Sequence, residues 1–140
     1  MSGIYIHIPF CKQACSYCDF HFSTKMTSKA TMVATLCKEL MLRKDAFLNE
    51  RIESVYFGGG TPSVLSAVEI SALLEAVNTH YVLSHRAEIT LEANPDDLTE
   101  DYVKALSKTA VNRLSIGVQS FNEQALKFMN RAPYCRFAAM

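Results

Sequence analysis

The sequence lacks the features that would assign it to several large classes of protein. Its 14 Lys and Arg residues balance 14 Asp and Glu residues, so the formal net charge is zero. Nucleic-acid binding is therefore not expected, because it usually leaves an excess of positive charge. No apolar run approaches the roughly 18 residues of a membrane span, so membrane contact is not indicated either. Charge runs, low-complexity tracts and internal repeats are also missing.

The amino-terminal stretch is apolar but does not resemble a secretion signal. Gly3 to Phe10 has no basic flank, and cysteines stand where small residues would mark a cleavage site. With 140 residues, the chain is expected to form one domain. We predict a cytoplasmic protein whose five cysteines are reduced, which favours metal binding or catalysis over disulfides.

The apolar pattern predicts four repeats of strand, loop and helix. Strands are predicted over residues 4–9, 54–57, 88–92 and 113–119. Helices are predicted over residues 27–48, 66–81, 99–107 and 122–130. Strands that alternate with helices through short connections are parallel and joined by right-handed crossovers. The fold class is therefore α/β, as a doubly wound open sheet or as a (β/α) barrel.

The strands themselves favour the barrel, because their side chains alternate. Ile89 and Leu91 alternate with polar neighbours, as do Leu114, Ile116 and Val118. A strand covered by helices on both faces would be almost wholly apolar. One face is thus expected to meet helices while the other lines a lumen that holds a polar cofactor. A one-sided sheet whose polar face meets water is the remaining alternative.

Two helices have clear signals. Ser66 and Glu69 form an S-x-x-E capping box at the start of the second helix. Its apolar residues recur at helical spacing, at Ile70, Leu73, Leu74, Val77 and Tyr81. The first helix is expected to bury a stripe formed by Met32, Val33, Leu36, Cys37, Leu40 and Met41. Cys37 is therefore predicted to be a core residue and not a ligand.

The strongest chemical signal is a cluster of cysteines directly after the first strand, Cys11-x-x-x-Cys15-x-x-Cys18. Three thiolates in one short loop can bind three corners of an iron–sulfur cubane and leave the fourth iron open to a small chelating molecule. A zinc site is the alternative, with His7 or His21 as a fourth ligand. A further alternative is that the three cysteines are unrelated and bind no common metal centre. The position after a strand favours the cluster, because cofactor sites of barrels and doubly wound sheets lie there.

The first motif resembles the signature of the oxygen-independent coproporphyrinogen III oxidase branch of the radical S-adenosylmethionine (SAM) superfamily. Three later motifs agree in order and lie at predicted strand ends. The four are Tyr5-x-His7-Ile8-Pro9-Phe10-Cys11-x-x-x-Cys15-x-Tyr17-Cys18, Gly58-Gly59-Gly60-Thr61-Pro62, Glu92-Ala93-Asn94-Pro95 and Ser115-Ile116-Gly117-Val118-Gln119-Ser120-Phe121.

The resemblance implies roles for individual residues. Ligands of a 4Fe–4S cluster would be Cys11, Cys15 and Cys18. Residues in contact with SAM would be Tyr5, Tyr17, Gly59, Gly60, Thr61, Glu92, Gln119 and Arg131. The glycines and Thr61 would receive its methionine moiety, and Glu92 would accept hydrogen bonds from its ribose. The implied chemistry is reductive cleavage of SAM to methionine and a 5′-deoxyadenosyl radical.

One position separates two members of this branch. Coproporphyrinogen dehydrogenases carry another cysteine two places after the third ligand, where this chain has Phe20. The loop resembles instead the HemW-type haem chaperones. They bind haem, at a site expected to lie outside this chain, and are thought to deliver it to haem-requiring proteins. The implied partners are haem or a porphyrin, an electron donor protein and a haem-accepting protein.

The resemblance ends after Ala132. Residues 1–132 correspond to the N-terminal part of the radical SAM core domain, and residues 133–140 are unmatched and suggest a truncation. The family barrel has six strands, so the expected fold is a partial (β/α) barrel with four βα units of six. An inactive cluster-binding fragment is therefore a third function, beside the chaperone and the oxidase. Such a fragment is expected to bind a cluster but to cleave SAM poorly.

Overall fold

The computed structural model describes residues 2–47 and 50–132, in which strands and α-helices alternate along the chain. The strands are β1 (Ser2–Ile8), β2 (Arg51–Gly59), β3 (Val82–Ala93) and β4 (Arg113–Ile116). The α-helices are α1 (Lys29–Leu42), α2 (Ala67–His80), α3 (Glu100–Leu106) and α4 (Glu123–Phe128). Short 3₁₀ turns occur at Met26–Ser28, Lys44–Phe47, Pro62–Val64 and Pro95–Asp97.

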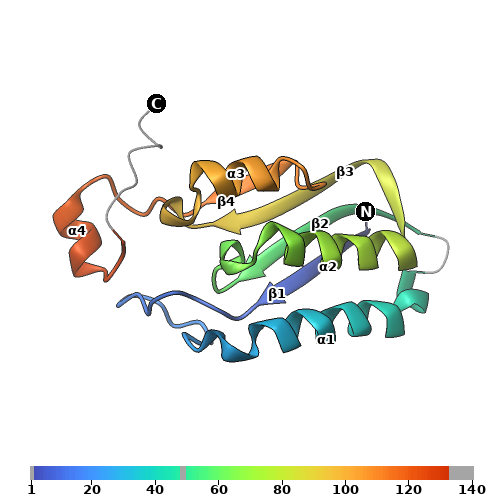
Figure 1. The fold of residues 1–140 in the computed structure, drawn as a ribbon, viewed down its shortest axis with the longest axis horizontal. Coiled ribbons are helices and arrows are strands. Elements are labelled where there is room, and N and C mark those ends of the chain that lie inside the picture. Colours follow the sequence, from blue (N-terminus) through green and yellow to red (C-terminus); the bar gives the residue numbers. More distant parts are fainter. Residues whose placement is uncertain (1, 48–49, 133–140) are drawn as a thin grey trace.

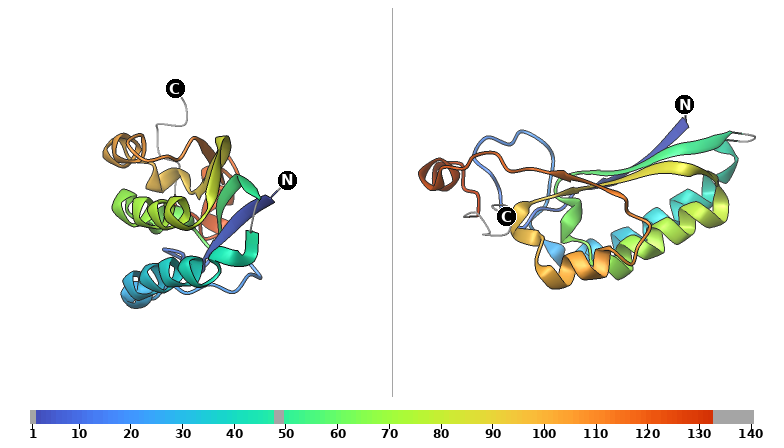
Figure 2. Two further views of the ribbon diagram at one scale, coloured as in Figure 1. Left: turned by 90° about the vertical axis from the view of Figure 1, so that its right-hand side faces the viewer. Right: turned by 90° about the horizontal axis from the view of Figure 1, so that it is seen from above.

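The four strands form one parallel sheet in the order β1-β2-β3-β4. Each strand lies beside the next one in the chain, and the order never reverses. Right-handed crossovers that all step in one direction put their helices on one side, and α1, α2 and α3 do cover a single face (Figure 1, Figure 2). A doubly wound sheet requires a reversal, so that alternative is wrong. The expected partial barrel of four βα units is confirmed.

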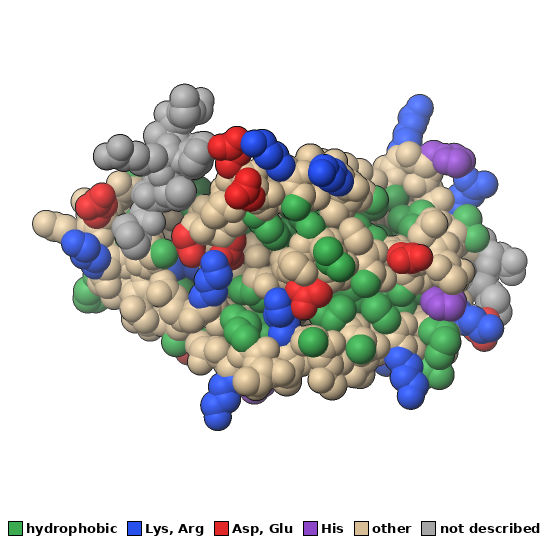
Figure 3. Space-filling view, in the orientation of Figure 1, with side chains coloured by type: hydrophobic (Ala, Val, Ile, Leu, Met, Phe, Trp, Pro, Cys, Tyr) green, Lys and Arg blue, Asp and Glu red, His purple; other side chains and the backbone are tan. Residues whose placement is uncertain are grey.

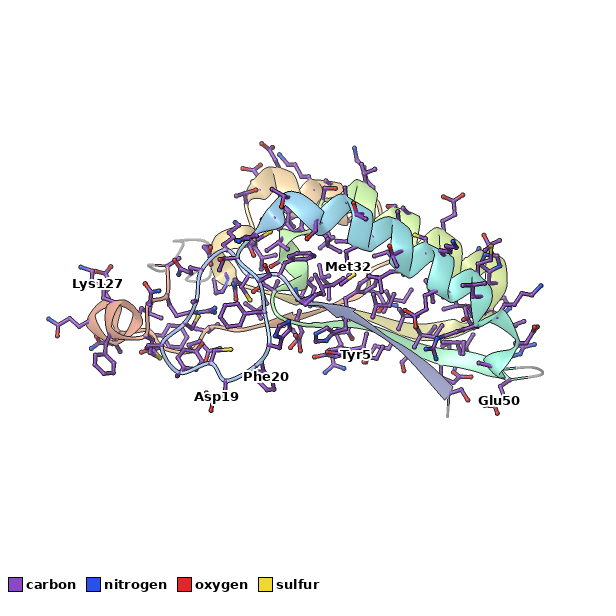
Figure 4. All side chains as sticks on the ribbon, turned by 90° about the horizontal axis from the view of Figure 1, so that it is seen from below. Tyr5, Asp19, Phe20, Met32, Glu50 and Lys127 are labelled. Atoms are coloured by element: carbon purple, nitrogen blue, oxygen red, sulfur yellow. The ribbon has the colours of Figure 1, made fainter. Side chains whose placement is uncertain are left out.

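The core lies between the sheet and these helices. Ile8, Phe57 and Leu91 come from three different strands and are almost completely buried, and they belong to one cluster with the apolar side of α2. The predicted second-helix residues are all buried there. Met32 also lies between α1 and the sheet, whereas Tyr5 projects from the opposite face (Figure 4). The alternation in the sequence therefore separates a helix-covered face from an open one, as predicted.

Helices α2, α3 and α4 begin where a polar side chain accepts free amide protons, whereas Ser28 before α1 makes no such bond. Ser66 and Glu69 form the predicted capping box, with the Ser66 hydroxyl accepting from the Glu69 amide. Thr99 caps α3 in the same way, and Asn122 Oδ1 accepts from two amides of α4. Each cap satisfies amides that have no partner within the helix.

Charged side chains of both signs are scattered over the helical face, mostly around its rim (Figure 3). This distribution agrees with the formal net charge of zero. No single-sign patch is visible on this face of the molecule.

Several predicted bounds need correction. The first strand begins at Ser2, and both β2 and β3 extend further than the apolar runs predicted. These extensions pair in register with a neighbouring strand, as Arg51 does with Val82, and pairing is invisible in a single strand's sequence. The first helix ends at Leu42, so Met41 lies in its last turn and is exposed, although it was expected in the buried stripe.

The largest difference concerns the fourth unit. β4 ends at Ile116 instead of Gln119, because the chain turns away and Gln119 adopts a φ of 63°. As a result, α4 lies beyond the ends of the strands instead of on the sheet (Figure 1). Ile116, which was expected to face a helix, is 45% exposed. Residues 133–140, the predicted unmatched tail, lie outside the described residues.

Candidate functional site

A cavity of about 290 Å³ opens at the carboxyl ends of the four strands. Every predicted site residue except Tyr5 lines it, which brings together Cys11, Cys15, Cys18, Tyr17, Gly59, Gly60, Thr61, Glu92, Gln119 and Arg131. The ends of β2, β3 and β4 and the loop that follows β1 form its wall. The volume is close to the lower limit of about 300 Å³ for small-molecule sites.

The cysteine loop leaves β1 at Pro9 and returns to it at Ser23. The Ser23 amide donates to the Pro9 carbonyl at 2.8 Å, and the Cys11 amide donates to the Ser23 carbonyl at 3.1 Å. Within the loop, the Cys18 amide donates to Cys15 at 3.2 Å. The base of the loop is thus closed by backbone bonds, while its middle extends past the sheet, with Asp19 pointing outwards (Figure 4).

The glycines after β2 are required by how closely this loop approaches. A Cβ added to Gly60 would lie 2.7 Å from the Phe10 carbonyl oxygen and 3.0 Å from the Cys11 sulfur. Gly59 has a φ of 115°, which strongly favours glycine. The amides of Gly60 and Thr61 donate to the carbonyls of Ile8 and Phe10, at 2.8 and 2.7 Å. These two amides are therefore already engaged and are not free to bind a ligand.

Two polar side chains contact the thiols. The Thr61 hydroxyl donates to Cys11 Sγ at 3.3 Å, and Arg131 Nη1 lies 3.8 Å from Cys15 Sγ. Burial raises the pKa of the Cys11 thiol, and the negative charges of the other two cysteines add to this effect, whereas Thr61 and the Arg131 guanidinium oppose it. The net effect favours the thiol form of Cys11, against which Thr61 and Arg131 act in favour of the thiolate that metal binding requires.

Arg131 is held in place from the β4 side. Its Nη2 donates to the Gly117 carbonyl at 2.7 Å, so the guanidinium bridges the end of β4 and the cysteine loop. The residues that follow α4 also form hydrogen bonds to the cysteine loop. The Met129 carbonyl accepts from the Ser16 amide at 3.1 Å, and Asn130 Nδ2 donates to the Ala14 carbonyl at 2.6 Å.

Glu92 sits on the open face at the end of β3 and accepts a hydrogen bond of 2.6 Å from the Tyr56 hydroxyl. This bond, together with burial, raises the pKa of Tyr56, so its hydroxyl stays a donor. Tyr56 also stacks on Tyr5 with a ring-centre distance of 6.0 Å. Tyr5 itself does not line the cavity, and its hydroxyl lies 3.2 Å from His7 Nδ1.

Comparison with known proteins assigns the chain to a family. The family described as "Radical SAM superfamily" matches residues 5–138. The chain belongs to the radical SAM superfamily. The sequence is 42% identical over 130 residues to the "Heme chaperone HemW" of Lactococcus lactis subsp. lactis (strain IL1403), covering 93% of this chain and 34% of that protein.

Two further relatives support this radical SAM assignment. The chain is 38% identical to the "Radical S-adenosyl methionine domain-containing protein 1, mitochondrial" of Bos taurus, covering 98% of this chain and 31% of that one. The solved structure of coproporphyrinogen III oxidase (HemN) from Escherichia coli, described as a radical SAM enzyme, matches with a TM-score of 0.84 and 31% identity, covering 93% and 30% of the two chains. The chain thus spans about a third of the length of these relatives.

The residues fit the cluster that this superfamily implies. Three thiols line one cavity, yet within residues 2–47 and 50–132 no three His, Cys, Asp or Glu side chains are grouped around the position of a single metal ion. Three thiols in one short loop are a donor set that suits an iron–sulfur cluster whose fourth iron is open to a small molecule. Cys37 lies away from the cavity, half-buried on α1 with its sulfur near the Ala72 carbonyl.

Sequence reasoning missed several residues of the site. Tyr56 was not predicted, because nothing in the sequence of β2 indicates that it pairs with Glu92. Asn94 lies in a motif that was noticed, but its bond to Thr61, of 3.4 Å, was not foreseen. Ser115, Gly117 and Gln13 also line the cavity without having been singled out as site residues.

Within the described residues, no helix has the length and apolar character needed to cross a membrane.

Proposed function

We propose that this chain binds a 4Fe–4S cluster and SAM in the cavity at the strand ends, as the N-terminal part of a HemW-type haem chaperone. The observation that carries the proposal is the meeting of Cys11, Cys15 and Cys18 with Glu92 and Arg131 around one cavity. Residues 1–132 are assigned to the radical SAM core, and the tail has no assigned role.

Each group has a role that its surroundings support. The three cysteines would hold the cluster, and the Arg131 guanidinium would balance the charge of thiolates next to it. The β2 carbonyls and the Thr61 hydroxyl would accept from the ammonium of SAM's methionine moiety, because the amides of Gly60 and Thr61 are already engaged. The free oxygen of Glu92 would accept from the ribose. Tyr17 and Gln119 line the same cavity, whereas Tyr5 stacks on Tyr56, the partner of Glu92, on the open face. The chemistry that the bound group supplies is one-electron reductive cleavage of the SAM sulfonium.

The chaperone assignment rests on two observations. The Lactococcus lactis chaperone is the more similar of the two porphyrin-related relatives above, at 42% identity against 31% for HemN. Phe20, which lines the cavity, stands where the oxidases carry a further cysteine. Haem, an electron donor protein and a haem-accepting protein are the partners this function requires. We propose a cytoplasmic location, since three reduced thiols need a reducing compartment.

The first experiment is electron paramagnetic resonance on the anaerobically reconstituted chain, reduced with dithionite, with and without SAM. We expect a 4Fe–4S signal that shifts when SAM is added. Cys15→Ser should abolish the signal, whereas Cys37→Ser, which removes a thiol outside the cavity, should leave it intact. A signal that survives Cys15→Ser, or zinc bound in place of iron, contradicts the proposal.

Coproporphyrinogen III oxidase is the second candidate, favoured by the TM-score of 0.84 with HemN. The two functions separate when the chain is incubated with coproporphyrinogen III, SAM and a reductant. The chaperone predicts that no protoporphyrinogen IX forms, and haem binding is not a criterion because the haem site is expected to lie outside this chain. Formation of protoporphyrinogen IX would assign the chain to the oxidases instead.

A further inference from the structure

One buried carboxylate near the site has no role in the function described so far. Asp97 ends the 3₁₀ turn that follows β3, and its side chain is only 2% exposed. The Ser63 hydroxyl donates to Oδ2. Oδ1 is buried and, among the described residues, accepts no hydrogen bond of standard geometry. The Lys12 ammonium forms an ion pair with this oxygen.

A buried carboxylate is costly unless a cation compensates its charge. Lys12 supplies that cation from the cysteine loop, where it directly follows Cys11. Its side chain is half-exposed, so the ammonium reaches inwards from the surface to a carboxylate that the fold has already buried. Release of Lys12 would leave the buried Asp97 carboxylate without its counter-ion. The free-energy cost of that uncompensated charge keeps this part of the loop next to the turn after β3.

The ion pair acts on a part of the loop that other bonds do not reach. On one side, the Thr61 amide holds the Phe10 carbonyl. On the other, Asn130 and Met129 hold Ala14 and Ser16. Between these anchors, the side chain of Lys12 ties the loop to the turn after β3. Three successive βα units therefore each hold a different point of the loop.

We propose that Lys12 and Asp97 form a latch that fixes the first turn of the cysteine loop, and that both are positioning residues for Cys11. The part that concerns the cluster rests on the proposed function, whereas the latch itself does not. Lys12 occupies a position of the cysteine motif to which the motif itself assigns no ligand. Its proposed role comes from its ion pair with Asp97, which lies 85 positions later in the sequence.

Limited trypsin digestion tests the latch in the cluster-free chain, because trypsin cleaves after Lys12 only when that side chain can enter the protease. Asp97→Asn keeps the shape of the side chain and the Ser63 contact but removes the charge. We expect cleavage after Lys12 to accelerate at least about fivefold, as loss of a local anchor favours local opening. Cleavage after Lys38, on α1, reports global unfolding and should not change. An unchanged rate after Lys12, or a parallel rise after Lys38, overturns the latch.

Cluster retention tests the positioning role. Reconstituted Asp97→Asn and Lys12→Met should lose iron to a chelator at least about fivefold faster than the native chain. The double variant should be no worse than the worse single one, because the two residues act as one pair. Lys38→Met is the matched control and should retain iron normally. Faster cleavage with unchanged iron loss overturns the positioning role. A native chain that binds no cluster refutes the proposed function, while the digestion result still decides the latch.

Discussion

The two faces of the sheet are built from the same strands but are held in different ways. On the covered face, Phe57 is completely buried in a continuous apolar core. On the open face, its neighbour Tyr56 is held by a hydrogen bond to Glu92, and Tyr5 is 58% exposed. Packing on the first face is collective, whereas the second depends on individual polar pairs. We therefore expect the covered face to determine stability and the open face to determine ligand binding.

The largest effect is expected on the covered face. Phe57→Ala removes a completely buried aromatic ring and leaves a cavity under the helices. Such a change costs about 3–5 kcal/mol of unfolding free energy. Urea denaturation of the native and variant chains measures it. A loss below about 1 kcal/mol would mean that the core tolerates the cavity and that the two faces are not distinct in this way.

Tyr56→Phe changes the adjacent residue on the opposite face. It should weaken ligand binding and have less effect on the unfolding free energy than Phe57→Ala. It removes the hydrogen bond to Glu92 but keeps the ring stacked on Tyr5. A bond to a charged group contributes about 1.5 kcal/mol or more, so SAM should bind roughly tenfold more weakly to the reconstituted chain. A SAM titration followed by electron paramagnetic resonance measures the change.

The control for Tyr56→Phe is Tyr102→Phe, which removes a tyrosine hydroxyl outside the cavity. Tyr102 donates to the Leu65 carbonyl at 2.9 Å on the helical side. Its substitution should leave SAM affinity unaltered. If both variants weaken SAM binding equally, the effect comes from general loosening and not from Glu92.

A smaller effect on stability is expected at the start of α2. Ser66→Ala removes the cap that accepts from the Glu69 amide and should cost about 1 kcal/mol of unfolding free energy. Ser71→Ala, in the middle of the same helix, is the matched control and should be neutral or slightly stabilising. Thermal unfolding followed by circular dichroism compares them. Equal behaviour of the two variants would show that the capping box contributes nothing.

The smallest effect is a difference in alkaline stability. Burial, with the nearby charges of Asp97 and Glu69, raises the pKa of Tyr102 to about 12. A folded-state pKa above the unfolded value of about 10 gives a stabilisation that is complete below pH 10 and is lost between about pH 10 and 12. Tyr102→Phe should therefore lose less stability than the native chain over this range. Denaturation at pH 9, 10 and 11 measures the slopes, and identical slopes would contradict the prediction.

The covered face could be predicted from the sequence because periodicity reports burial directly. The buried residues of α2 and its capping box were identified in this way. The helix α4 was predicted, but its position relative to the sheet was not. α4 has the pattern of a helix, but the left-handed turn at Gln119 carries it away from the sheet.

The candidate site was predictable in part for a different reason. Parallel strands bring all their carboxyl ends to one edge, so motifs that follow successive strands must meet there. Cys11, Thr61 and Glu92 were predicted together on that basis and on the family resemblance, and they line one cavity. The cofactor roles of these residues stay predictions.

The sequence by itself determined the α/β architecture, the faces of the strands and the set of thiols, because these follow from local spacing. Only the tertiary structure decided which distant side chains pair. The Tyr56–Glu92 bond and the Lys12–Asp97 ion pair each join residues from different βα units. Such pairs leave no periodic trace in the sequence, since their separation along the chain depends on the lengths of the intervening helices and loops.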